Sequence, residues 1–277
     1  MPLYFFRVIV YTVLILITLG IIFIFYTLII NSTRAHTEIQ QGFSLLPGKS
    51  FISNFRNLLD DHNMFVLSGL KNSFIIAFST AILTTYFSAL AAYGIHMYKF
   101  KGRTFFYFFM LAVIMVPSSI ASIGLVTMLY SINWTDNFWV IIIPAIASPT
   151  TFFFMKQYLE STLPKEIVEA ARVDGSSEFR TFNQIVLPVL KPALAVQFIF
   201  SFVASWNNLF LPGLIIQSGN KRTVPIIISL LGNSDPKTFD LGKIYMLMLL
   251  AIIPMLIIYL IFSKKIIKGV TLGSVKG

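Results

Sequence analysis

Polar residues that could do chemistry gather in two stretches of this chain. One is a charged segment, residues 157–191, in which acidic and basic side chains occur together. The other is a polar stripe within an apolar run, whose members follow the spacing i, i+4, i+8, i+11 and so share one helix face. A polar stripe at membrane depth should not face lipid, so it predicts either a water-filled path or hydrogen bonds to neighbouring helices. The stripe consists of Gln197, Ser201, Ser205 and Asn208, with Asn207 beside it.

Catalytic and nucleotide-binding chemistry finds less support. The histidines, His36, His62 and His96, are far apart and lack the spacing of metal ligands, and cysteine is absent. No apolar run carries paired carboxylates, clustered histidines or a Ser/Lys pair, which argues against an intramembrane enzyme. Segment 42–50 resembles a P-loop, but it has one residue too many between its glycines and no strand before it. We therefore predict that the chain is not an enzyme and holds no metal or cofactor of its own.

The composition places the chain in a bilayer. Of its 277 residues, 56% are hydrophobic and 12% are charged, and the mean hydropathy is +0.81. A helix needs about 20 apolar residues to span the hydrocarbon core, and six charge-free runs are long enough. The first run is too long for a signal peptide, and Pro117 predicts a kinked or tilted helix in the third, followed by a turn at 133–137. The runs are Val8–Ile30, Asn72–Tyr98, Thr104–Thr135, Asn137–Met155, Pro192–Asn220 and Ile244–Ser263.

The distribution of lysine and arginine predicts the orientation of these spans. With the N-terminus inside, the inner segments carry 13 of these residues and the longer outer segments carry 8. Both termini are therefore expected in the cytoplasm, in a multi-pass protein of a bacterial cytoplasmic membrane. The formal net charge of +10 then reflects this orientation and contact with lipid headgroups. Nucleic-acid binding is not expected, because no segment combines clustered basic residues with a soluble fold.

Three regions follow along the chain. Residues 1–71 hold the first transmembrane helix and an extracytoplasmic segment, residues 72–263 hold the other five spans, and residues 264–277 form a cytoplasmic tail. In the extracytoplasmic segment, Phe51, Phe55, Leu58 and Leu59 recur at helical spacing, which fits an amphipathic helix on the outer face or a solvated connection. The second span has small-residue faces, which predict close packing, with a partner subunit as the expected neighbour. Those faces comprise Ala77, Thr80, Ala81, Thr84, Ser88 and Ala89.

The charged segment predicts a helix, a tight turn and a second helix. Pro164 suits the first turn of the first helix, and Ile167 and Ala171 are expected on one face. Gly175 is the natural stop, because glycine accepts the positive φ of a helix C-terminus.

The second helix of this segment is expected to start at a serine cap. Ser176 would cap it, with Glu178 in its first turn, and Pro188 and Pro192 would end it. Its apolar face would comprise Phe179, Phe182, Ile185 and Val186.

The same segment resembles a known family. The run Glu169–Gly175 and the residues that follow it as far as Pro192 are similar to the EAA loop, which marks permease subunits of ATP-driven (ABC) importers. Trp206–Pro212 and the C-terminal stretch Gly269–Gly277 resemble the carbohydrate-uptake branch, in particular its maltose-type second permease subunit. The resemblance extends over residues 70–277 in the family's order.

The resemblance implies an all-α integral membrane protein of the type I importer class, with six transmembrane helices and a core permease domain at 72–263. It implies a permease subunit that forms half of the path for a sugar or oligosaccharide. A permease for another small solute is the alternative; a secondary transporter is less favoured, because the spans lack charges. The implied partners are a second permease subunit, two ATPase subunits or domains that hold ATP and Mg, an extracytoplasmic substrate-binding protein, and membrane lipid.

The resemblance also implies roles for single residues. The loop 157–192 would form a coupling helix pair seated in a cleft of the ATPase, and Glu169 is a candidate ion-pair partner for a base there. A merely solvated loop is the plain alternative. The implied coupling residues are Glu169, Ala170, Ala171, Asp174 and Gly175, and the tail residues expected near the ATPase are Thr271, Gly273, Lys276 and Gly277.

Overall fold

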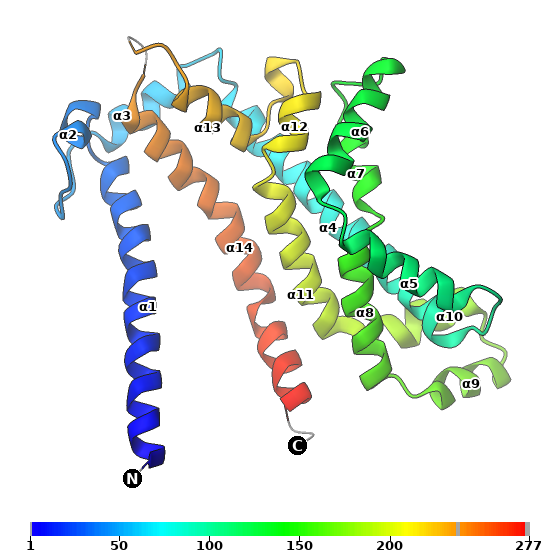
Figure 1. Ribbon diagram of the computed structural model, residues 1–277. Helices are drawn as coiled ribbons and strands as arrows, with labels where there is room; N and C mark the ends of the chain where they lie inside the picture. The colour runs from blue at the N-terminus through cyan, green and yellow to red at the C-terminus, as the bar shows by residue number, and fades with distance from the viewer. Residues whose placement is uncertain (1, 237–238, 275–277) are drawn as a thin grey trace. The chain divides into compact units, whose positions relative to one another are not determined.

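The computed structural model describes residues 2–236 and 239–274 and divides the chain into two compact units. The first unit takes residues 1–67 and 227–253, and the second takes residues 68–226 and 254–277. The described residues form helices joined by turns, with no β-strand among them, which confirms the all-α prediction. The elements labelled in Figure 1 and the two short turns η1 and η2 are α1 (Pro2–Ser32), α2 (His36–Gln40), α3 (Phe51–Leu59), α4 (Val66–Met97), α5 (Arg103–Ile114), α6 (Ser118–Ser131), α7 (Trp139–Ala145), α8 (Pro149–Thr162), α9 (Lys165–Val173), α10 (Glu178–Thr181), η1 (Phe182–Val186), α11 (Leu187–Trp206), α12 (Phe210–Ile215), η2 (Gly219–Lys221), α13 (Val224–Gly232) and α14 (Leu241–Ser274).

The predicted spans all appear as helices. In the described part of the chain, five helical stretches are long and apolar enough to cross a membrane, and the bent pair α5 and α6 makes a sixth. This pair is broken more sharply than the predicted kink, because its two helices meet at 96°. Pro117 precedes the first residue of α6, where its missing N–H and its ring cannot continue the hydrogen-bond ladder of α5. The predicted turn at 133–137 is confirmed, with positive φ angles at Asn133 and Asp136.

The prediction that Pro188 and Pro192 end the second short helix is wrong. The chain stays helical from α10 through the π-helical turn η1 into α11, and Pro192 lies inside α11. In η1 the N–H of Leu187 reaches back five residues to the carbonyl of Phe182. This wider turn just ahead of Pro188 accommodates a ring that a regular α-helix would exclude. The second helix of the charged segment therefore continues without a break into the fifth span.

The first unit contains the predicted amphipathic helix, α3, but its buried face differs from the expected one. Of the four residues with the predicted helical spacing, Leu58 is fully buried, whereas Phe51 and Phe55 are exposed. The buried neighbour of Leu58 is a polar residue, Asn54, whose amide donates to the carbonyls of Ser32 and Arg34 at 2.9 Å each. The amide hydrogen bonds explain why Asn54 can be buried, since they satisfy its donors.

The P-loop-like segment 42–50 belongs to the same unit and is an irregular loop between α2 and α3. A side chain at Gly48 would come within 2.6 Å of the carbonyl oxygen of Thr33, so this glycine permits a close approach to the end of α1. Its N–H is donated to the hydroxyl of Thr33 at 2.8 Å.

The small-residue faces of the second span, α4, are covered by the chain itself. The six small residues predicted to meet a partner subunit are buried within the second unit. Thr84 donates its hydroxyl to the carbonyl of Ala145 at 2.7 Å, and Ser88 donates to that of Ser148 at 3.5 Å. The expected neighbour was therefore wrong: the small side chains let α4 approach the α7–α8 segment closely.

Candidate functional site

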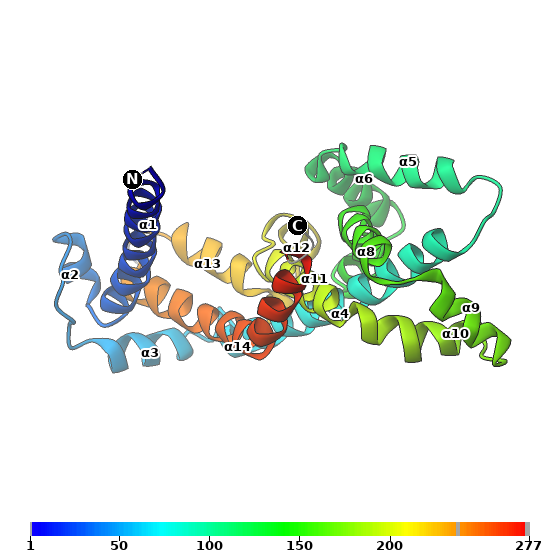
Figure 2. The same ribbon diagram turned by 90° about the horizontal axis from the view of Figure 1, so that it is seen from below.

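The charged segment forms the predicted helix, turn and helix, as α9 and α10, which lie side by side in both ribbon views (Figure 1 and Figure 2). Gly175 has a φ of +78°, and its N–H is donated to the carbonyl of Arg172 at 3.0 Å. The N–H of Ser176 is donated to the carbonyl of Ala171 at 2.9 Å. These two bonds form a Schellman motif, the helix ending that a left-handed glycine allows. The prediction for Gly175 is confirmed.

Two details at the helix starts differ from prediction. Pro164 is the residue before α9 rather than part of its first turn. Ser177, not Ser176, caps α10, because its hydroxyl accepts the N–H of Arg180. The Ser176 hydroxyl instead accepts a hydrogen bond from the hydroxyl of Thr181 at 2.9 Å. A cap must stand one residue before the first helical residue, and two successive serines left that position ambiguous.

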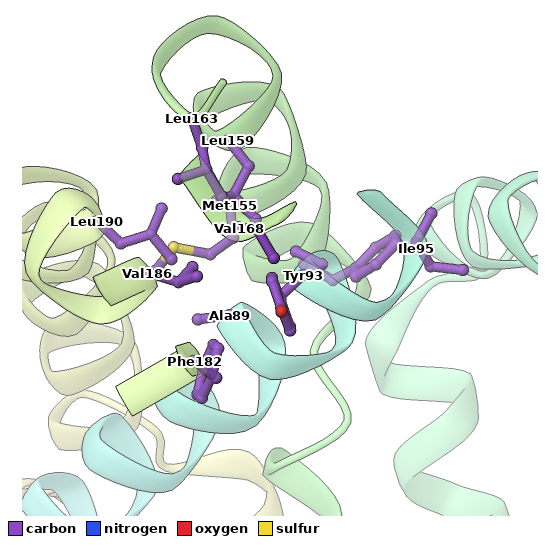
Figure 3. Packing of buried hydrophobic residues seen from close by; sticks show 12 residues of the cluster. Ala89, Tyr93, Ile95, Met155, Leu159, Leu163, Val168, Phe182, Val186 and Leu190 are labelled. Atoms are coloured by element: carbon purple, nitrogen blue, oxygen red, sulfur yellow. The ribbon is translucent and has the colours of Figure 1, made fainter. Parts of the chain in front are cut away.

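A buried apolar cluster holds this helix pair on the rest of the second unit. Figure 3 shows side chains from α4, α8, α9, η1 and α11 converging, with Val168, Phe182 and Tyr93 among them. The ring of Phe182 lies 5.5 Å from that of Tyr93 and 5.7 Å from that of Tyr86, centroid to centroid. Because close-packed interiors transmit displacement, a push on α9 or α10 reaches α4, α8 and α11 together.

A polar clamp fastens the pair to the end of α4. The Glu178 carboxylate accepts the Nε–H of Arg172 at 2.6 Å and the hydroxyl of Tyr93 at 2.9 Å. The Arg172 guanidinium also lies over the ring of Tyr98, 5.3 Å from its centroid. The hydrogen bond to Glu178 raises the pKa of Arg172 further above its usual range, so the arginine stays charged. The three residues Arg172, Glu178 and Tyr93 are called the clamp below.

The outward side of the pair presents apolar and acidic side chains. Ile167, Val173 and Phe179 are 44%, 87% and 68% exposed, although Ile167 was predicted to share a face with Ala171, which is buried, and Phe179 to share one with Phe182, which is also buried. Val168, one position after Ile167, takes the inner place on α9, because the end of α8 covers that side. Phe179 lies on α10, about one helical turn before Phe182, and of the two rings only that of Phe182 is buried. Of the five implied coupling residues, Glu169, Ala170, Asp174 and Gly175 are exposed and Ala171 is buried.

Glu169 is free to meet a partner. Within the described residues it makes no ion pair and no side-chain hydrogen bond. Of the implied tail residues, Lys276 and Gly277 lie outside the described residues. Thr271 and Gly273 belong to the last turns of α14, which continues to Ser274 instead of ending at the predicted span boundary.

A cavity of about 780 Å³ opens within the second unit where α4, the break between α5 and α6, the start of α8 and α11 meet. None of the described residues that line it is ionisable. Its polar side chains are hydroxyl groups and one amide: Thr80, Thr84, Ser118, Ser122, Ser148, Thr150, Ser201, Ser205 and Asn208.

The cavity divides the predicted polar stripe. Ser201, Ser205 and Asn208 line it, whereas Gln197 is buried away from it and Asn207 is exposed outside it. Sequence reasoning missed Thr80, which it interpreted as a packing residue of α4. It also missed Ser118 and Thr150, which stand beside helix-starting prolines, where a single sequence carries no periodic signal. Clusters of His, Asp or Glu that could hold a metal ion are absent from the described residues.

A second polar network joins the turn before α7 to the loop after α12. The Asp136 carboxylate, in the turn before α7, accepts the N–H groups of Gln217 and Ser218 at 3.0 Å and the Ser218 hydroxyl at 2.6 Å. It also pairs with the Lys221 ammonium at 2.9 Å. Burial opposes the charge on Asp136, but these hydrogen bonds outweigh burial and hold its pKa well below the usual range. The network ties the turn at 133–138 to the loop after α12.

Comparison with known families and structures agrees with this geometry. The sequence model of the family "Binding-protein-dependent transport system inner membrane component" matches residues 84–270. The fold is similar to that in the crystal structure of a bacterial ABC transporter involved in the import of the acidic polysaccharide alginate. That match has a TM-score of 0.80 at 19% identity and covers 94% of this chain and 95% of the other.

Curated relatives extend over nearly the whole chain. The arabinooligosaccharides transport system permease protein AraQ of Halalkalibacterium halodurans is 31% identical, over 95% of this chain and 96% of its own length. The trehalose/maltose transport system permease protein MalG of Thermococcus litoralis is 32% identical, over 85% of each chain.

Proposed function

Because this chain belongs to the family of binding-protein-dependent transport system inner membrane components, we propose that it forms half of the membrane path of an importer for a neutral sugar or oligosaccharide. The chain is a multi-pass permease subunit of an ABC importer and not an enzyme; ATP is hydrolysed on separate subunits. We further infer that its partners are a second permease subunit, two ATPase subunits or domains, and an extracytoplasmic substrate-binding protein.

The observation that carries the coupling role is the outward face of α9 and α10. Ile167, Val173 and Phe179 expose apolar surface, and Glu169, one turn before Val173 on α9, has an exposed carboxylate that is unpaired within the described residues. Exposed apolar side chains grouped beside a charge mark protein interaction sites. The clamp and the apolar cluster hold this face rigidly on α4, α8 and α11, so movement of a docked ATPase would reach the helices that line the cavity. A docked ATPase would put α9 and α10 in the cytoplasm, and the lysine and arginine distribution favours the same side for both termini.

The lining of the cavity supports a neutral cargo. Hydroxyl and amide groups both donate and accept hydrogen bonds, as sugar hydroxyls do. A charged solute would be left without a counter-charge in a low-dielectric site, because the described lining residues are not ionisable. The sugars in the names of AraQ and MalG favour the same class of cargo.

Docking is tested with Glu169→Ala in the assembled transporter. Truncating one member of a buried interfacial charge pair costs about 2 to 5 kcal/mol, a loss of ~30-fold or more in affinity for the ATPase subunit. Purified complexes are compared for retained ATPase subunit and for ATP hydrolysis stimulated by the binding protein. Asp60→Ala removes an equally exposed acid in the first unit and should change neither quantity. Wild-type retention and stimulation in Glu169→Ala would contradict the ion pair at the docking face.

A further inference from the structure

Hydroxyl groups in this chain's helices usually donate to a carbonyl on the preceding turn, the ordinary arrangement where lipid offers no partner. Thr85 of α4 does so, donating to the carbonyl of Ala81 at 2.7 Å. Thr80 on the same helix, and Ser201 and Ser205 on α11, depart from this pattern. In the described part of the chain their hydroxyls have no hydrogen-bond partner, and all three line the cavity.

Thr80 is the most informative of the three. It is only 7% exposed, and its Oγ1 atom is buried without a partner. A buried hydroxyl without a partner is destabilising, so such groups in native proteins are normally satisfied by protein, water or a ligand. Thr80 lines the cavity, but its Oγ1 atom is enclosed, so the side chain has to rotate about χ1 before this hydroxyl can meet a molecule held there.

From these unpartnered hydroxyls we infer that the cavity is a solute-binding subsite in which Thr80, Ser201 and Ser205 hydrogen-bond the hydroxyl groups of a neutral sugar unit. The inference rests on the proposed function and deepens it, because it makes this chain bind the cargo directly. The volume, about 780 Å³, lies within the range of small-molecule pockets. Apolar lining residues such as Leu125 and Ile141 would cover the C–H faces of a sugar ring.

The chain's lack of cysteine offers a direct binding assay. Ala204→Cys, at a lining residue that makes none of the inferred hydrogen bonds, is placed in the assembled transporter in proteoliposomes, and modification of this chain by a small thiol reagent is followed by mass spectrometry. The probes are trehalose, maltose and arabinotriose, with sn-glycerol 3-phosphate as a charged comparator. A sugar that is taken up should slow the modification severalfold, and the charged comparator should not.

The role of Thr80 is tested by Thr80→Val on the same background. Removing one neutral hydrogen bond should raise the sugar concentration that gives half-protection about fivefold. Thr85→Val is the matched control, because it makes the same change on the same helix at a hydroxyl already satisfied by Ala81, and it should leave half-protection unchanged.

The outcomes separate the subsite from the proposed function. Sugar uptake without any protection at Ala204→Cys would overturn the subsite and leave the function standing. An equal shift in Thr80→Val and Thr85→Val would overturn the assignment of Thr80. Uptake of sn-glycerol 3-phosphate in place of every sugar would overturn the proposed sugar function together with the neutral subsite.

Discussion

Replacing Glu178 by alanine should detach α9 and α10 from the end of α4 without unfolding the spans. The pair with Arg172 is partly exposed, with side-chain exposures of 34% and 44%, so screening limits its loss to about 0.5 to 1 kcal/mol. Tyr93 is 3% exposed, and its hydroxyl would lose its acceptor, which costs about 1 to 3 kcal/mol. A total of about 2 kcal/mol corresponds to a ~30-fold larger population of the detached state.

Hydrogen exchange measures this detachment locally. Amides of residues 165–181 should exchange ~30-fold faster in Glu178→Ala, because local opening governs exchange there, while amides of α8 should keep their protection. Glu178→Gln retains an oxygen that can accept from Tyr93, so it should raise exchange only a few-fold. ATP hydrolysis should continue in Glu178→Ala while the sugar imported per ATP falls, because the docked face no longer moves with α4.

Two results would refute the clamp. Unchanged exchange at residues 165–181 in Glu178→Ala would show that the apolar cluster alone holds the pair. Equal effects of Glu178→Ala and Glu178→Gln would show that the Tyr93 hydrogen bond contributes nothing.

The remaining predictions concern the turn at Gly175, the hydrogen-bond network of Asp136, the polar stripe of α11 and the membrane topology. Gly175→Val should lower sugar uptake and stimulated ATP hydrolysis, because a β-branched residue strains the left-handed turn. Gly102→Val is the control: it introduces the same strain at φ +91° outside the α9–α10 pair and should preserve stimulated ATP hydrolysis better. Equal losses in the two variants would contradict a coupling role for Gly175. Asp136→Asn should lower the melting temperature of the complex at pH 7 by the equivalent of about 1 to 2 kcal/mol. Folding lowers the pKa of Asp136, so its contribution to stability is present above the ordinary pKa of 3.8 and is lost as the pH falls toward the folded-state pKa. The difference in melting temperature between Asp136→Asn and wild type should therefore shrink on acidification. A constant difference would contradict the role of the Asp136 charge. Asn208→Leu should reduce uptake more than Asn207→Leu, since only the first residue lines the cavity, with complex assembly retained in both as the control. Tags at either terminus should resist external protease in intact cells, and cleavage of either tag would contradict the predicted orientation.

Local physics was enough to predict the membrane-spanning architecture and the coupling turn. A run of about 20 apolar residues has few alternatives to a helix in lipid, so the spans were readable from composition. Gly175 ended α9 where expected, because a positive φ is costly for other residues and almost free for glycine. The family was inferred from the resemblance of Glu169–Gly175 to the EAA loop, since hydrophobic periodicity alone does not identify a family.

Tertiary packing decided what the pattern left open. Pro188 should break a regular helix, but the π-helical turn before it widens the backbone, and the buried side chain of Phe182 anchors that turn against α4. The spacing of the polar stripe treats its members alike, yet the fold puts Ser201 and Ser205 in the cavity and Gln197 outside it.

The clamp and the surroundings of Thr80 depend on residues far away in the chain. Glu178 lies 85 residues from Tyr93, and a single sequence gives no sign that their side chains meet. Thr80 and Thr85 look equivalent in sequence, being similar positions of one apolar helix. Thr85 donates to the carbonyl one turn back on its own helix, whereas Thr80 stands at the cavity without a partner among the described residues, because the helices packed around α4 decide what each side chain meets.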